Sequence, residues 1–156
     1  MNSQTLLQVL LVLHITGFTI MAGTVVADTS IYIRLKKYFI ADKGKALTML
    51  ESVAAFPALI GAGALLLILT GIGMVSILPV FAGMIWFRIK MILVVAIIIN
   101  GAVIGRRIVL RLKKLLVENA HSGDEAIEVI KGKLNMIYVS QLLLFLVIFI
   151  LSVFKF

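Results

Sequence analysis

Long apolar stretches alternate with shorter polar ones along the chain, and four of them are long enough to cross a membrane as helices. They cover about residues 6–33, 46–75, 84–116 and 134–153. A helix rises about 1.5 Å per residue and the hydrocarbon core of a bilayer is about 30 Å thick, so about 20 apolar residues suffice for one crossing. The pattern predicts an all-α fold, a polytopic membrane four-helix bundle that forms a single transmembrane domain over residues 1–156.

The polar stretches between these helices differ in kind. A basic connection follows the first helix, the uncharged turn Ser76–Gly83 follows the second, and a polar connection over residues 117–133 precedes the fourth. Pro57 lies inside the second predicted helix and predicts a kink, because proline removes a helical hydrogen bond. In the polar connection, Ser122 and Glu125 have the spacing of a capping box, which predicts a short helix there.

The basic residues are distributed unevenly, and this predicts the orientation. The N-terminus and the turn after the second helix contain no lysine or arginine, and the C-terminus has only Lys155. Most of the 15 lysines and arginines lie in the other two connections and at the end of the third helix: Arg34, Lys36, Lys37, Lys43, Lys45, Arg106, Arg107, Arg111, Lys113, Lys114, Lys131 and Lys133. Since positively charged connections stay in the cytoplasm, we expect an N-out/C-out topology in a bacterial inner membrane.

Composition narrows the classes of function. Of the 156 residues, 62% are hydrophobic and 14% charged, the formal net charge is +8, and there is no cysteine. The lack of cysteine excludes disulfides, thiolate metal sites and thiol catalysis. Because the basic residues flank apolar helices, we expect membrane lipids as partners and no nucleic acid. A homo-oligomer or a second membrane protein is a further candidate partner.

Small residues mark the expected contacts between the helices, because transmembrane helices pack closely where side chains are small. They occur as a pair on the first helix, as four glycines on the second and as a pair on the third: Gly23, Ala27, Gly61, Gly63, Gly71, Gly73, Gly101 and Gly105. These positions predict compact packing and indicate no particular function.

His14 is an ionisable residue well inside the first apolar helix. Such residues mark functional sites, because lipid does not compensate the loss of their hydration. At about 100° per residue, several residues share a helical face with this histidine: Gly17, Met21, Thr24, Val25 and Asp28. We expect this face to look into the bundle. The pattern leaves open whether His14 binds a ligand or is a neutral histidine hydrogen-bonded to a neighbouring helix.

Lys90 is the second ionisable residue at membrane depth. It lies about six residues into the third helix and His14 about eight residues into the first, so their depths agree to about 3 Å. Both side chains can therefore border one cavity, with snorkelling of Lys90 to the headgroups as the alternative. His121 lies in the cytoplasmic connection and cannot reach His14, which leaves Met21 and Lys90 as second ligands of a metal. A zinc or copper site would lack ligands.

Two further groups of polar residues are expected to join the helices. Two acids and two bases balance near the cytoplasmic end: Asp28, Glu51, Arg106 and Arg107. We expect them to form an interhelical ion-pair network, with a proton or anion gate as the alternative. Polar side chains on the third and fourth helices are expected to form interhelical hydrogen bonds: Asn100, Asn135, Tyr138 and Gln141.

The chain resembles the HemJ family of four-helix membrane proteins, which are haem-b-containing protoporphyrinogen oxidases related to the wider CopD-like group. Short pieces carry the likeness over nearly the whole chain: LHITGFTIMAG, FPALIGAGALLLILTG, WFRIKMILVV, the pair Gly105-Arg106 and LNMIYVSQLLLFLVIFILSVFKF. The resemblance implies that His14 is a ligand of haem b. It also implies that Pro57, Trp86 and Lys90 stand at the family's proline, tryptophan and lysine.

The chain departs from the family's pattern at several positions. Met21 stands in place of a tryptophan, and Asn100-Gly101 in place of a tyrosine–histidine pair. Met136 stands in place of a glutamate, and the first helix has no histidine at its end. The chain therefore resembles a divergent member of the family.

Three hypotheses for the function remain open at the level of the sequence. In the first, His14 ligates haem b in a cavity lined by Lys90 and Met21, for redox or porphyrin chemistry like that of a protoporphyrinogen oxidase. In the second, the protein is a non-enzymatic bundle that binds a partner or assembles a larger complex. In the third, it is a small transporter that uses Asp28, Glu51 and Lys90. Whether the protein is an enzyme stays open.

Overall fold

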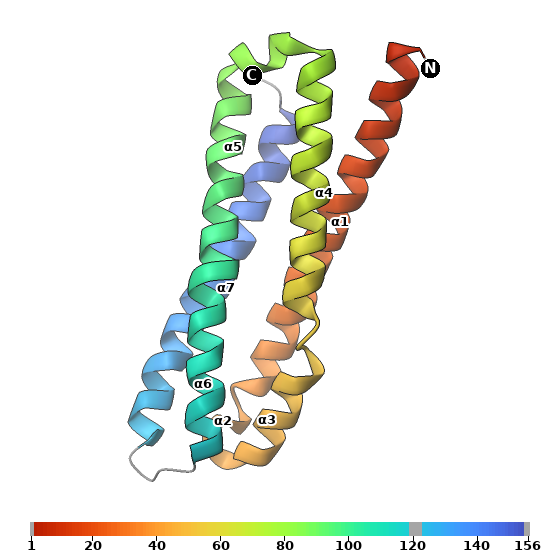
Figure 1. Ribbon diagram of the computed structural model, residues 1–156. Coiled ribbons are helices and arrows are strands. Elements are labelled where there is room, and N and C mark those ends of the chain that lie inside the picture. Colours follow the sequence, from red (N-terminus) through yellow and green to blue (C-terminus); the bar gives the residue numbers. More distant parts are fainter. Residues whose placement is uncertain (1, 119–122, 155–156) are drawn as a thin grey trace.

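Four long helical segments run alongside one another in the computed structural model, which describes residues 2–118 and 123–154 (Figure 1). Each is long and apolar enough to cross a membrane: Ser3–Leu35, Lys43–Ile77, Ile85–Val117 and Glu125–Val153. The start of the first segment and the end of the fourth lie at the same end of the bundle, with the turn between the second and third segments (Figure 1). The prediction of an all-helical chain with four membrane-length helices is confirmed for the described residues.

The helical segments are built from shorter elements. In chain order these are α1 (Ser3–Leu35), α2 (Tyr38–Ala41), α3 (Lys43–Ser52), α4 (Phe56–Ile77), the 3₁₀ turn η1 (Pro79–Gly83), α5 (Ile85–Ile98), the π-helix η2 (Ile99–Gly105), α6 (Arg106–Glu118) and α7 (Gly123–Val153). Asp42 separates α2 from α3, and its side chain accepts a hydrogen bond of 2.9 Å from the backbone amide of Lys45. An aspartate in this N-cap position satisfies an amide that has no partner inside the helix.

The second segment is not the single kinked helix that the sequence predicts over residues 46–75. α3 ends at Ser52, and after a turn α4 begins at Phe56 with Pro57 in its first turn. Proline costs no hydrogen bond there, because the first amides of a helix have no intrahelical acceptor. Pro57 therefore starts a helix instead of bending one.

The fourth helix begins at Gly123 and not near residue 134. The charged stretch read as a connection continues the helix beyond the apolar span. Its residues Ile127, Ile130 and Leu134 are buried together against α6. The spacing of these three residues is that of one helical face, so burial of this face explains why the polar stretch is helical. Ser122 of the predicted capping box lies outside the described residues.

Two hydrophobic cores hold the segments together. One lies where α1, α2, α3, α6 and α7 meet, and consists of Tyr32, Leu35, Phe39, Ala46, Leu112, Leu116, Ile127, Ile130 and Leu134. The other lies farther along the bundle and draws on all four segments: Met21, Val25, Leu67, Ile97, Phe145 and Ile148. Many leucine, isoleucine and valine side chains outside the cores are exposed. A lipid environment suits such a surface, whereas water penalises it.

Five serine and threonine side chains of α1 satisfy their hydrogen bonds within the helix itself. Each donates to the carbonyl oxygen four residues earlier: Thr16, Thr19, Thr24, Thr29 and Ser30. Lipid offers a hydroxyl no partner, so this bond removes most of the cost of placing it in the membrane.

Candidate functional site

The backbones of α1 and α4 approach each other closely at two glycines. A Cβ atom added to Gly63 would lie 2.8 Å from the backbone oxygen of Gly17 and 3.0 Å from Cβ of Met21. A Cβ atom added to Gly17 would lie 3.0 Å from the backbone oxygen of Gly63. The distance of 2.8 Å is shorter than real Cβ contacts, so glycine is required at position 63, and a Cβ atom at position 17 would need the facing backbone of α4 to shift. The predicted pair Gly23 and Ala27 has no such role, since both residues are exposed.

His14 lies one turn from this contact and is half-buried beside α4. Its Nδ1 atom is 2.9 Å from Oγ1 of Thr70. A Cβ atom added to Gly71 would lie 3.7 Å from Cε1 of the histidine, so the ring lies against the backbone of α4. The stripe containing Gly17, Met21 and Val25 is buried, which confirms that this face of α1 looks into the bundle.

The hydrogen bonds of Thr70 determine the tautomer of His14. The Thr70 hydroxyl has one proton, and its shortest contact is 2.6 Å to the backbone oxygen of Leu66. We assign the proton to that bond, so that Oγ1 accepts the hydrogen bond from the histidine. His14 then carries its proton on Nδ1, and Nε2 keeps a lone pair. A neutral imidazole of this tautomer is the form that binds metals through Nε2.

Sequence reasoning missed Thr70, although a signal for it exists. The apolar helix α4 contains two hydroxyl side chains, Thr70 and Ser76, in an otherwise apolar run. Thr70 is 3% exposed, so it is one of the few buried polar residues of the bundle. A buried hydroxyl in a membrane helix marks a position where a partner from another helix is expected.

Lys90 lies on α5 and is half-buried. An electrostatic interaction links it to His14 on α1. That the two side chains border one cavity stays a prediction. The pair brings a neutral imidazole and a side chain that carries a positive charge when protonated into the same region.

Met21 lies in the apolar core and not on an open face beside His14. It is 1% exposed, and it contacts Gly63 at the close approach of α1 and α4. The two residues are seven positions apart on one helix, which corresponds to a rise of about 10 Å. Met21 therefore packs in the contact between α1 and α4, about two helical turns away from His14.

The predicted network of two acids and two bases is not formed. Asp28 accepts a hydrogen bond of 3.1 Å from the hydroxyl of Tyr138 on α7. Glu51 lies 3.5 Å from Nζ of Lys113 at an exposed position. Arg106 and Arg107 are exposed, and within the described part of the chain no ion pair joins either of them to Asp28 or Glu51. Long basic side chains at a membrane interface extend outward to water and headgroups, which explains the difference.

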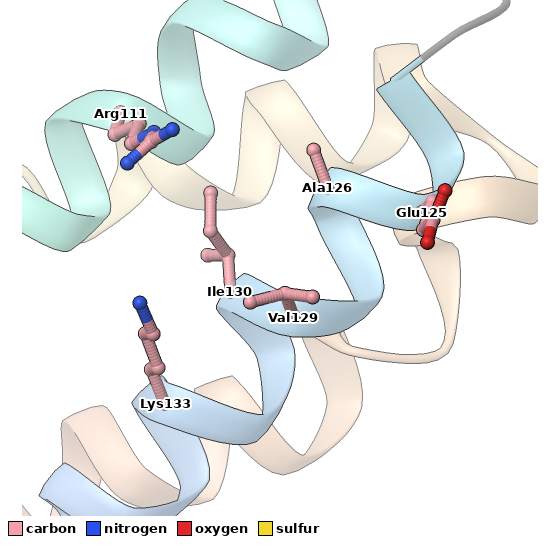
Figure 2. A pocket seen from close by; sticks show the side chains of 6 residues that line it. All are labelled: Arg111, Glu125, Ala126, Val129, Ile130 and Lys133. Carbon is pink, nitrogen blue, oxygen red and sulfur yellow. The ribbon is translucent and has the colours of Figure 1, made fainter.

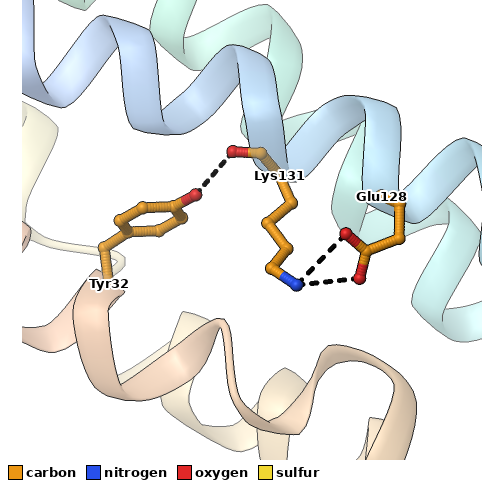
Figure 3. A network of polar contacts seen from close by, with 3 residues as sticks. All are labelled: Tyr32, Glu128 and Lys131. Atoms are coloured by element: carbon orange, nitrogen blue, oxygen red, sulfur yellow. Dashed lines mark hydrogen bonds and ion pairs between the residues drawn. The ribbon is translucent and has the colours of Figure 1, made fainter.

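A pair of stacked tyrosines lies next to Asp28, at the end of the bundle that contains α2 and α3. The rings of Tyr32 and Tyr138 have centroids 4.5 Å apart. Tyr32 donates a hydrogen bond of 2.7 Å to the backbone oxygen of Lys131, whose Nζ lies 2.8 Å from Glu128 (Figure 3). Tyr32 continues the stripe of His14 and Asp28 by one turn. That spacing is the signal by which it could have been found.

Asn100 and Gln141 join the third segment to the fourth, as predicted. The Asn100 side chain donates bonds of 2.9 Å to Ser140 and 3.0 Å to Gln141, and Gln141 is 4% exposed. A Cβ atom added to Gly101 would lie 3.2 Å from Nε2 of Gln141, so the glycine gives this amide its room. The predicted interhelical bond of Tyr138 is its bond to Asp28. Asn135 instead lines a pocket beside Tyr32.

Few metal ligands come together in this chain. Over residues 2–118 and 123–154, no group of three histidine, cysteine, aspartate or glutamate residues could hold a metal ion. His121 lies outside the described residues. Comparison of the chain with protein-family models, curated proteins and solved structures finds no match. The interpretation of the site therefore rests on the residues themselves.

Proposed function

We propose that the protein is an integral membrane protein that binds haem b through Nε2 of His14. The hydrogen bond between His14 Nδ1 and Thr70 carries the proposal. Histidines that ligate metals usually donate their other ring hydrogen to an oxygen, which holds the ring in place and makes the ligating nitrogen more basic. His14 has this arrangement, and the helix contact at Gly17 and Gly63 fixes the two helices that make it.

The donor set around His14 fits haem better than a bare metal ion. A bare zinc or copper ion needs three or four protein ligands, whereas haem supplies four nitrogens and needs only one or two. His14 supplies one. A protonated Lys90 would bind a carboxylate of the porphyrin, and a neutral Lys90 would offer its amine as a ligand of the iron. Met21 is assigned to packing and not to the iron.

The proposal includes a reaction class and a location. Bound haem would supply one-electron redox chemistry, and the resemblance to HemJ suggests oxidation of a porphyrinogen that enters from the lipid, with its electrons passing to a membrane acceptor such as a quinone. In such a reaction, the chain would hold the iron with His14 and the acidic groups of the porphyrin with Lys90. The asymmetry of lysine and arginine supports an N-out/C-out topology in a bacterial inner membrane.

A pyridine haemochrome assay tests the proposal. The wild-type protein is expressed with an ample haem supply, extracted in mild detergent and purified. We expect about one haem b per chain, because the site has one histidine at membrane depth. A purified, folded protein without haem would contradict the proposal.

Replacing Thr70 with valine tests the hydrogen bond itself. Valine has nearly the same shape as threonine but cannot accept the Nδ1 hydrogen. We expect haem affinity to fall about 10-fold to 100-fold, the usual effect of losing such a supporting bond. Haem transfer to apomyoglobin measures it. Thr70→Ser keeps the hydroxyl and should retain haem as the wild type does, so equal loss in both variants would contradict the role of the bond.

A non-enzymatic role as an assembly subunit is the second candidate, and one observation favours it. In the most apolar window of the third segment 6% of the residues are buried, against 28% in the fourth. A largely uncovered membrane helix leaves room for a second membrane protein. If haem is absent, purification from native membranes with a co-purifying partner is the result that this role predicts.

A further inference from the structure

A groove runs between α6 and α7 at the basic end of the bundle. Its volume is about 350 Å³, and its lining residues come from both helices: Arg111, Glu125, Ala126, Val129, Ile130 and Lys133. Figure 2 shows Lys133 extending toward Arg111, with Ile130 between them. Glu125 lies at the other end of the row (Figure 2). The groove thus has two cations at one end and an apolar floor.

Among the described residues, no acid forms an ion pair with either cation of the groove. The neighbouring Lys113 and Lys131 form ion pairs with Glu51 and Glu128. Within the part of the chain that the structure describes, neither Arg111 nor Lys133 forms an ion pair. Two basic side chains that converge without an acid between them attract a group with negative charge.

The position of the groove indicates where such a group would come from. About 20 residues cross the hydrocarbon, so a crossing that starts at Ile85 ends near residue 104, and one that ends at Val153 starts near residue 134. Lys133 therefore lies at the edge of the hydrocarbon, and Arg111 lies about 10 Å beyond that edge. The headgroup layer of a bilayer occupies this depth.

We propose that this groove binds the phosphate group of an anionic phospholipid between Arg111 and Lys133, with the acyl chains of the lipid entering the hydrocarbon beyond Lys133. The guanidinium offers paired donors to phosphate oxygens, and the ammonium adds a second positive charge. A phospholipid holds its phosphate at this depth, whereas a soluble anion or an acidic peptide has to reach it from the water.

Lipid titration followed by native mass spectrometry tests the proposal. The probes are phosphatidylglycerol and phosphatidylcholine with the same short acyl chains, added to the purified protein in detergent. For Arg111→Gln/Lys133→Gln we expect affinity for phosphatidylglycerol to fall about 30-fold, since each basic residue near an anionic lipid contributes about a factor of five. Affinity for phosphatidylcholine should change little.

A matched control removes two charges of the same types elsewhere at the same end. Arg34→Gln/Lys37→Gln replaces two exposed residues outside the groove, and we expect it to lower the affinity less than twofold. An equal loss in both double variants would overturn the proposal in favour of a diffuse surface charge. Displacement of the lipid by inorganic phosphate or by a soluble polyglutamate peptide would overturn it in favour of an anion or peptide site. If the double variant does not fold, Lys133→Gln alone is compared with Lys37→Gln.

Discussion

Replacing His14 with alanine is expected to abolish the Soret absorption of the purified protein, whereas replacing His121 with alanine leaves it unchanged. His14 is the histidine at membrane depth and is oriented by Thr70, so its loss removes the proposed ligand of the iron. The chain has two histidines, which makes His121→Ala a control of the same chemical change. Absorption spectra at equal protein concentration measure the difference.

The same experiment separates loss of haem from loss of fold. Circular dichroism and the elution volume in size-exclusion chromatography should be the same for both variants. Alanine at position 14 leaves the glycine contact of α1 and α4 intact. An unchanged Soret band in folded His14→Ala would exclude this histidine as the ligand, and with it the function proposed here.

Replacing Gly63 with leucine is expected to destabilise the protein more than the same change at any other glycine of α4. The added side chain would collide with the backbone of α1 at Gly17, where even a Cβ atom comes within 2.8 Å of an oxygen. Backbone atoms cannot move aside as the end of a side chain can. Separating the helices costs about 3 kcal/mol or more by analogy with overpacked cores. Thermal unfolding in detergent measures this loss.

Gly61 provides the matched control for this prediction. It lies two residues away on the same helix, and a Cβ atom added there meets nothing within 4 Å. Gly61→Leu should therefore unfold near the wild-type temperature. Because Gly63→Leu moves α4 away from α1, it should also weaken the bond between His14 and Thr70 and lower the haem content. Equal stability of the two variants would show that the close approach does not hold the helices together.

The helices themselves could largely be predicted from the sequence, because length and hydropathy are properties of contiguous residues. The limits of the first and third segments differ from the prediction by only a few residues at each end. The predicted helix limits were wrong where the same local sequence is compatible with two structures. Pro57 either bends a helix or starts one, and the polar residues after Gly123 either form a loop or extend a helix beyond the membrane. Packing against α6 decided the second case, through Ile127 and Ile130.

The site could be predicted only in part. Helical periodicity correctly placed the face of His14 toward the bundle, and the placement of Lys90 at the same cavity stays a prediction. It could not find Thr70, because the partner of a side chain depends on how far one helix slides along another. It also paired Asp28 with arginines, whereas the structure gives it a tyrosine. Opposite charges in a sequence suggest ion pairs. At a membrane interface, however, exposed arginines extend outward to water and headgroups. The half-buried Asp28 instead accepts a hydrogen bond from the neighbouring Tyr138.

The sequence alone determined that this chain has four membrane-length helices and a histidine at membrane depth, since both follow from hydropathy along the chain. Only the tertiary structure decided which of several small residues bring the helices together. On α1, Gly17 and not the pair Gly23 and Ala27 forms the contact with Gly63 of α4, although these small residues of α1 look equivalent in the sequence. The choice depends on the relative rotation and translation of two helices, which their combined surfaces determine. The same arrangement of α1 and α4 places Thr70 opposite His14. The hydrogen bond that orients the proposed ligand therefore forms only when the helices are packed.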